Sequence, residues 1–473
     1  MIRRYGGQRS LFEAALGPDT MDALLDPTLR RLDVVLADEP LVNAVFQRQA
    51  GRFPRSRDRG RPGTPADVIL RLLVLQRLRG WTFDETEREV RASLVYRWVT
   101  HIYLGPVPDA KTLVRQSMVV GEAGVRALHE RIAMLARTEL HVQGRRARVD
   151  TTVVETNVHY PTDATLLMDG LRVLTRTAHR VAVATGHAAL RIRNRLRAAN
   201  RRVREIGRAS RGTTPNGRAR LQDGYRRLLA LTRATLRDAR GVLQALEQTP
   251  PPAGSAAVWR AVLRARDIVR TFVPRVEQII AQTRARVFGG DTHYPGKLLS
   301  LFEPHTEAIR KGKAAKPTEF GHLVKIQEAE QGVIVDYDVY EHRPADTTLL
   351  PSTIECHKKV FGRAPHLLAA DAGFWSGTNR KHAEEAGVKR VCVPATGRPS
   401  NAQRQRQHER WFRRGQRWRT GAEGRISLLK RRDGLSRCRY RHFTGSQRWT
   451  GWGVLAHNIR LLITRTGKRS PAR

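Results

Sequence analysis

The hydrophobic positions of the first hundred residues recur mostly at helical spacing. This pattern predicts helices up to about residue 50, through apolar positions that include Leu24, Leu25, Leu29 and Leu32. A basic stretch containing Gly and Pro follows at 51–63 and is typical of an exposed linker. The next segment is nearly all apolar up to Leu78 and stops at Gly80, which predicts a buried helix.

A capping box predicts where the following helix begins. Thr82 is followed three residues later by Glu85, and in such a box each side chain accepts a hydrogen bond from the other residue's backbone. This helix and a basic, aromatic segment at 94–100 complete a set of short helices joined by tight turns. The set resembles a DNA-binding helix-turn-helix, although any small helical bundle has a similar pattern.

The periodicity changes near residue 146. The segment 146–155 is rich in β-branched residues and is the first predicted strand. Asp150 lies within it, where a carboxylate is costly unless it faces a ligand. A loop at 157–163 follows, and another helix begins near Thr165.

Residues 166–288 are predicted to be a helical insertion. Thr249 and the three prolines after it mark a turn between two helices, each with an apolar seam in steps of four and three. The seams are Tyr225, Leu229, Thr232, Leu236, Ala239, Leu243 and Leu246, then Val258, Val262, Ala265, Val269, Phe272, Val276 and Ile279. They predict an antiparallel coiled-coil hairpin, preceded by an arginine-dense helix from Leu171 to Ile206. A solvated coiled coil needs no function, but so many arginines with few acids favour a polyanion beside them.

Strand-forming segments return after Gly290. The predicted strands are 298–303, 322–328, 333–340, 366–371 and 388–394, with a hairpin turn at 329–332 and helices at 347–361 and 379–387. Asp371 ends an apolar strand, at the edge where open α/β sheets bind ligands. The segment 398–414 is predicted to be a basic loop that orders on a phosphate backbone.

Charge and cysteine usage narrow the class of protein. Of 473 residues, 86 are Lys or Arg and 44 are Asp or Glu, a net charge of +42 that favours DNA or RNA as partner, with a membrane surface as the competing polyanion. The longest apolar run is broken by arginines, so no segment is expected to span a bilayer, and the N-terminus lacks the apolar core of a secretory signal. The three separated cysteines, Cys356, Cys392 and Cys438, fit a reducing cytoplasm.

A predicted helix at 416–430 combines an acid with cations on one face. At about 100° per residue, four residues fall within one narrow arc: Gln416, Arg419, Glu423 and Lys430. A carboxylate flanked by cations suits a site that holds a metal ion and a phosphate together. The alternative is a solvated helix in which Arg419 and Glu423 form an ordinary i,i+4 pair.

Carboxylates at three places suggest phosphoryl transfer. The two-metal mechanism needs a few carboxylates that converge on two cations about 3.5–4 Å apart. Hard oxygen ligands suit Mg²⁺ or Mn²⁺, and the sequence has no set of His and Cys ligands for zinc. Spacing alone does not select Asp150, Asp371 and Glu423 over the other candidate acids, which are Glu155, Asp163, Asp336, Asp338 and Asp346.

A family resemblance makes the selection. From about residue 10 to 465 the sequence resembles the DDE transposases of bacterial insertion sequences, especially the group whose third acid lies in a Y-x2-R-x3-E-x6-K signature. Arg419, Glu423 and Lys430 match that spacing, whereas Gln416 replaces the tyrosine. The contexts of the other two acids, at 148–163 and 368–374, and the flanking stretch 317–325 also resemble that family.

The resemblance implies a fold, a reaction and a site. It implies an α/β fold with an RNase H-like mixed sheet flanked by helices, interrupted by the helical insertion and preceded by an all-α DNA-binding region. Asp150, Asp371 and Glu423 would coordinate two Mg²⁺ or Mn²⁺ ions, while Lys430 and Arg419 would contact DNA phosphate or orient Glu423. The enzyme would nick double-stranded DNA at the terminal inverted repeats of an element and join the freed 3′-OH to target DNA, as a homodimer at least, in the bacterial cytoplasm.

The predicted domain boundaries follow from the patterns and the resemblance together. They are a helical DNA-binding region at 1–140, the first part of the catalytic domain at 141–165, the insertion at 166–288, the remainder of the catalytic domain at 289–440, and a C-terminal helix with a basic tail at 441–473.

Three other classes of protein remain open. A catalytically inactive or domesticated relative keeps the fold and binds nucleic acid without cutting it. A metal-dependent nuclease cuts without joining strands. A structural coiled-coil scaffold explains the insertion but leaves Asp150 and Asp371 as strand charges without a purpose.

Overall fold

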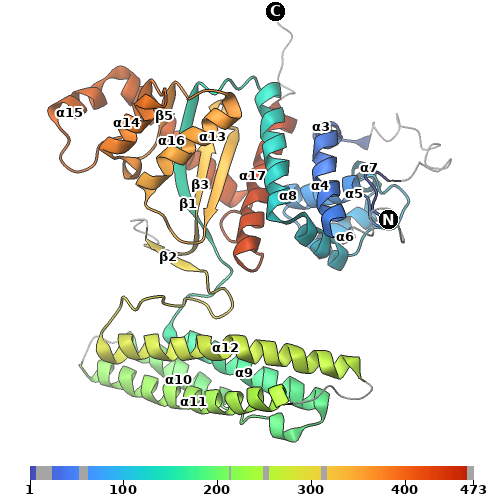
Figure 1. Ribbon diagram of the computed structural model, residues 1–473, viewed down its shortest axis with the longest axis vertical. Helices are drawn as coiled ribbons and strands as arrows, with labels where there is room; N and C mark the ends of the chain where they lie inside the picture. The colour runs from blue at the N-terminus through green and yellow to red at the C-terminus, as the bar shows by residue number, and fades with distance from the viewer. Residues whose placement is uncertain (7–23, 53–61, 212–214, 249–254, 311–316, 466–473) are drawn as a thin grey trace, which may run out of the picture. The chain divides into compact units, whose positions relative to one another are not determined.

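The structure is a computed structural model that describes residues 1–6, 24–52, 62–211, 215–248, 255–310 and 317–465. The chain forms two compact units (Figure 1). One unit is Met1–Asn157 with Ile309–Arg473, and the other is Val158–Ala308, so the second is inserted into the sequence of the first. The predicted boundaries at residues 140 and 440 fall inside the first unit and stay predictions.

A mixed six-stranded sheet organises the first unit, and the predicted α/β class is confirmed. Its strands are β1 (Arg146–Glu155), β2 (Glu307–Arg310), β3 (Thr318–Glu328), β4 (Ile334–Tyr340), β5 (Leu367–Ala369) and β6 (Arg390–Cys392). On one side β1 pairs antiparallel with β3, which pairs antiparallel with β4 and also neighbours β2. On the other side β1 pairs parallel with β5, and β5 pairs parallel with β6. The strand β1 therefore joins an antiparallel half to a parallel half.

Alternation along β1 sends its side chains to two different layers of helices. Ala147 and Val149 pack with α13 (Leu349–Phe361) and α14 (Gly377–Glu385) on one face. The opposite face is covered by α16 (Arg410–Arg431) and α17 (Phe443–Arg465), against which Val154 packs. Asp150 points to this second face, because it lies four positions before Val154 and side chains an even number of positions apart share a face.

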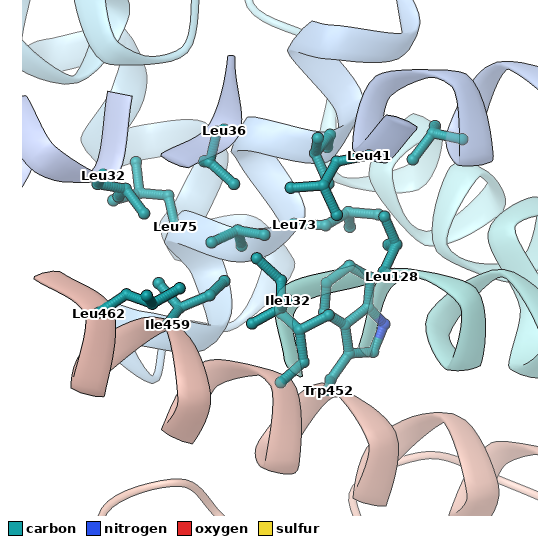
Figure 2. Close-up of a cluster of buried hydrophobic side chains, with 14 of the residues drawn as sticks. Leu32, Leu36, Leu41, Leu73, Leu75, Leu128, Ile132, Trp452, Ile459 and Leu462 are labelled. Carbon is teal, nitrogen blue, oxygen red and sulfur yellow. The ribbon is translucent and has the colours of Figure 1, made fainter. Parts of the chain in front are cut away.

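The N-terminal helices share one hydrophobic core with α17. Figure 2 shows side chains from both parts of the chain in contact, among them Leu73 and Ile132 with Trp452 and Ile459. These helices are α3 (Pro27–Leu36), α4 (Glu39–Arg52), α5 (Ala66–Arg79), α6 (Phe83–Ala92), α7 (Leu94–Val99) and α8 (Ala110–Glu139). The helix α17 thus links the described N-terminal helices to the sheet.

Two sequence predictions for this region are confirmed. The helix α5 is buried from Ala66 to Arg77 and ends at Gly80, whose φ of 72° lies in the left-handed region that favours glycine. The capping box of Thr82 and Glu85 starts α6, with both reciprocal hydrogen bonds present at 3.1 and 2.7 Å. The DNA-binding role of these helices stays a prediction.

The second unit is a bundle of four helices. They are α9 (Asp163–Thr185), α10 (Leu196–Ala209), α11 (Pro215–Gln248) and α12 (Ala256–Gly289). Most residues of the two predicted seams are buried, but they pack with α9 and α10 as well as with each other. The coiled-coil geometry itself stays a prediction, and the predicted turn at 249–252 lies outside the described residues.

Three local predictions are wrong. The expected single helix from Leu171 to Ile206 is two helices, because Gly186 adopts φ 72° and ends α9. The expected strand at 298–303 is irregular: Leu298 and Leu301 face the core of the bundle, and Ser300 Oγ accepts hydrogen bonds from the two backbone N–H groups that begin a turn.

The third wrong prediction is the basic loop at 398–414. It contains α15 (Asn401–His408) and the first turns of α16. Ser400 and Gln403 form a capping box that starts α15, and Arg406 pairs with Glu384 at 3.3 Å. The sequence does not indicate this helix by periodicity, because α15 is rich in polar residues and has no buried apolar stripe.

The buried His129 of α8 makes the first unit sensitive to acid. Burial is the main cause that lowers its pKa to about 4, against the opposing effects of Asp336 and of the 3.1 Å hydrogen bond to the Ile334 carbonyl. The unfolded chain binds this proton near pH 6.5, so acidification between about 6.5 and 4 favours unfolding. We expect His129→Gln, which keeps a donor for Ile334, to lessen the pH dependence of the free energy of unfolding by up to about 1.4 kcal/mol per pH unit in this window.

Chemical denaturation of both proteins at several pH values measures this difference. Burial also lowers the pKa of His357, but His357 is present in both proteins and cancels in the comparison. Equal slopes for the variant and the parent protein between pH 4 and 6.5 would contradict the assignment.

Candidate active site

The strand register places two of the predicted acids level with each other. In the parallel pair β1–β5, Arg148 lies opposite Ala369. Two residues further along both chains are Asp150 and Asp371, and Asp371 keeps an extended backbone with φ −76° and ψ 174°. Neighbouring strands are about 4.8 Å apart, and positions two residues apart share a face. Asp150 therefore belongs to the face of the sheet that α16 covers, and Asp371 directly follows the end of the neighbouring strand at the same level.

The third predicted acid comes from α16. Arg419 links it to the first, since its guanidinium lies 3.4 Å from Glu423 Oε1 and 4.0 Å from Asp150 Oδ2. The Glu423 side chain is 67% exposed, whereas those of Arg419 and Asp150 are 15% and 13% exposed. Glu423 is thus the most exposed of the three side chains, and Arg419 contacts both acids.

Gln416 holds this part of α16 against the ends of two strands. Its side-chain amide donates to the carbonyl oxygens of Cys392, at 2.8 Å, and Ala370, at 3.4 Å. Its own oxygen accepts a 3.3 Å hydrogen bond from Arg419. The residue that departs from the family signature therefore anchors the helix next to Asp371 and orients Arg419.

Lys430 lies apart from the other predicted site residues. It is seven residues beyond Glu423 on α16, about 10 Å along the helix. Its ammonium is 3.3 Å from Glu319 of β3, which is buried. The structure brings together Asp150, Arg419 and Glu423, and sets Asp371 level with Asp150, but it gives Lys430 a separate partner.

Asp346, an acid that spacing did not single out, borders the site. Asp346 Oδ2 and Asp371 Oδ1 would each lie 3.2 Å from a Cβ built on Gly373. The two carboxylates therefore flank this glycine, and a side chain there would crowd both. Only the tertiary fold shows this, because 25 residues separate the two acids.

The remaining candidate acids have structural partners. Lys325 is buried and pairs with Asp338 at 2.7 Å and with Asp336 at 3.3 Å. Burial opposes ionisation of Asp336, but Lys325 and Arg126 outweigh it and lower the pKa of its carboxyl. Asp163 pairs with Arg286 at 2.5 Å, and Glu155 with Arg437 at 3.7 Å. These contacts account for the four acids without chemistry.

The three acids have the ligand type that hard cations prefer, but they are not grouped around one point. Asp150, Asp371 and Glu423 supply the oxygen ligands that Mg²⁺ and Mn²⁺ prefer. Within the described part of the chain, however, no three or more His, Cys, Asp or Glu side chains are grouped closely enough to hold a metal ion. Arg419 contacts both Asp150 and Glu423, and its side chain is a physical reason why these two carboxylates do not meet.

Comparison with known proteins gives a family match. Residues 20–117 match the family model of a transposase domain (DUF772), which covers the N-terminal helices up to the start of α8. This match supports a transposase, a DNA-processing enzyme. No curated protein and no solved structure matches the chain. None of the described helices is long and apolar enough to cross a membrane.

The anchoring contacts of Gln416 predict a measurable stability effect. Gln416→Leu leaves the carbonyl oxygens of Cys392 and Ala370 without this donor, so we expect a loss of about 1–3 kcal/mol in the free energy of unfolding. Arg417→Ala is the matched control, because Arg417 is exposed on the same helix, and it should change stability by less than about 0.5 kcal/mol. Denaturant titration of both variants measures the effect, and equal stabilities would show that Gln416 is not an anchor.

Proposed function

We propose that this chain is a DDE-type transposase that binds the terminal inverted repeats of a mobile element, cleaves DNA at its ends and joins the 3′-OH to target DNA. The observation that carries the proposal is the level placement of Asp150, on β1, and Asp371, just beyond the end of the neighbouring parallel strand β5, with Glu423 on the helix that covers the Asp150 face. The match to a transposase domain at residues 20–117, a different part of the chain, supports the proposal independently.

The sheet topology supports an RNase H-like catalytic domain. The resemblance implies a mixed sheet flanked by helices, and in this chain β1, which carries Asp150, joins the antiparallel half of such a sheet to the parallel half. The second acid follows the adjacent parallel strand, where ligands of open sheets bind. The helical unit at 158–308 is inserted directly after the first of these strands.

Each site residue has a proposed role. Asp150, Asp371 and Glu423 would hold two Mg²⁺ or Mn²⁺ ions, which would supply activation of the attacking water or 3′-hydroxyl and stabilisation of the leaving oxygen. Arg419 neutralises Asp150 and Glu423 in the DNA-free protein and takes a phosphate of the scissile strand when DNA binds. That exchange frees both carboxylates at the moment the substrate arrives. Lys430 contacts DNA phosphate further along the helix, and the protein acts as a homodimer on paired ends.

Two related functions differ from this one in their products. An inactive relative of the same fold would bind the repeats without cutting, and the contact of Arg419 with both acids is the observation that favours it. A nuclease without strand joining would release nicked DNA only. An assay that resolves nicked, joined and uncut DNA separates all three.

We expect Asp371→Asn to reduce strand cleavage by more than about 100-fold. A residue that only supports a metal ligand usually costs less activity than this when it is changed, and Asp371 is proposed as a ligand itself. DNA binding should stay near the parent level, because the change removes one carboxylate and no cation. Asp267→Asn is the matched control, since Asp267 is an exposed acid of α12, and it should cut normally. Cleavage by Asp371→Asn at the parent rate would overturn the assignment of the acids.

Salt dependence tests the DNA-binding part of the proposal. With six or more phosphate contacts, affinity for duplex DNA should fall by about 10³-fold or more between roughly 50 and 200 mM salt. Fluorescence anisotropy with a labelled duplex across this range gives the slope. A flat response would exclude a polyanionic partner for this +42 chain.

A further inference from the structure

A basic cleft lies along the flank of α16 that faces away from the acids. The cleft has a volume of about 1070 Å³. Six arginines line it: Arg145, Arg146, Arg363, Arg390, Arg410 and Arg414. The indole rings of Trp411 and Trp418 form part of its wall, and both are half-buried.

Helix geometry separates this cleft from the candidate active site. At 100° per residue, Arg410, Arg414 and Trp418 lie on roughly the opposite side of α16 from Gln416, Arg419 and Glu423. The cleft is bordered by the first residues of the parallel strands, Arg146, Leu367 and Arg390, whereas Asp371 follows the end of β5. The body of the helix therefore stands between the two sites.

The arginines of the cleft are available to an anion. Among the described residues, none of the six forms an ion pair with a carboxylate. All six arginines are exposed. Glu409 is the one acid of the lining, and it accepts a hydrogen bond from the Trp411 indole. Burial and then the charges of Arg390, Lys389 and Arg145 lower the pKa of His366, which also lines the cleft. The local potential is strongly positive.

The tryptophans are held beside these charges. The guanidinium of Arg390 lies 5.6 Å from the Trp411 ring centre, and that of Arg146 lies 5.5 Å from the Trp418 ring centre. Such cation–π contacts keep flat cationic and aromatic surfaces together. Phosphate-binding cations interleaved with stacking surfaces are the features that bind single strands, because a duplex keeps its bases stacked and offers only phosphates.

We infer that this cleft is a second DNA site, which binds an unpaired stretch of DNA through phosphates on the arginines and bases on Trp411 and Trp418. The volume exceeds that of most small-molecule pockets, roughly 300–1,000 Å³, so more than one nucleotide fits. Since α16 intervenes, the strand in the cleft is a different segment from the one beside Asp371. The choice of DNA as ligand rests on the proposed function.

The experiment uses the full chain and two fluorescein-labelled probes, a single-stranded (dT)15 and a duplex of the same length, followed by anisotropy at several salt concentrations. Arg410→Ala/Arg414→Ala should weaken binding of (dT)15 and reduce its salt slope by about 1.4, or about 0.7 for each lost phosphate contact. Trp411→Ala should weaken it roughly 5- to 100-fold with an unchanged slope, since it removes a base stack. Trp411→Phe should restore most of the affinity.

Arg417→Ala is the matched control, because Arg417 is an exposed arginine of α16 outside the cleft, and it should bind (dT)15 like the parent protein. Photocrosslinking with an iodouracil-containing strand gives a site-specific measure, with the crosslink expected at Trp411 or Trp418. Variants that all bind (dT)15 like Arg417→Ala would overturn the site. Equal losses for duplex and single strand, without a crosslink, would make it a duplex-phosphate surface and overturn the assignment to unpaired DNA.

The two proposals fail separately. If the parent protein cuts no DNA but the cleft variants lose (dT)15 binding, the transposase proposal fails and the cleft stands. If Asp371→Asn abolishes cleavage while the cleft variants bind normally, the cleft fails and the transposase proposal stands.

Discussion

A buried ion pair between β1 and β3 determines where α16 lies. Arg148 and Glu328 face each other across the strand pair, with hydrogen bonds of 2.5 and 3.1 Å, and their side chains are 7% and 3% exposed. Arg148 also donates to the Trp418 carbonyl of α16, and Arg425 of the same helix approaches Glu328 at 3.4 Å. Loss of one partner would leave a buried charge uncompensated, a defect that costs about 3–5 kcal/mol. The helix is therefore tied to the sheet within two residues of Asp150.

This fixed crossing gives α16 two functional flanks. One flank, with Gln416, Arg419 and Glu423, borders the carboxyl end of β5. The other, with Arg414 and Trp418, borders the first residues of the strands. A single helix thereby separates a cluster of acids, which suits chemistry on a phosphate, from a cluster of arginines, which suits binding of one. The small residues Gly415 and Gly421 allow the close approach, because a side chain at either position would collide with Cys392 or Arg148.

Much of the secondary structure could be predicted from local patterns, and the errors have physical causes. The buried helix α5 and the capping box at Thr82 follow from apolar continuity and from two residues at fixed spacing. The helix α15 differs from the predicted loop because its stability comes from its cap and its contact with Glu384 rather than from an apolar stripe. The segment at 298–303 differs from the predicted strand because its leucines pack onto helices. Periodicity shows which residues are apolar but not which surface covers them.

The charge, the α/β alternation and the residue types that phosphoryl transfer requires can be predicted from the amino-acid sequence, because they depend on composition and on spacing within single elements. Which residues meet depends on the tertiary fold. It set Asp150 level with Asp371 through strand register, placed Arg419 between two acids, put Asp346 beside Gly373, and gave Lys430 to Glu319. It also assembled six arginines from four separate stretches of chain into one cleft. Contacts between distant segments depend on how the layers pack, and no local pattern of residues records that packing.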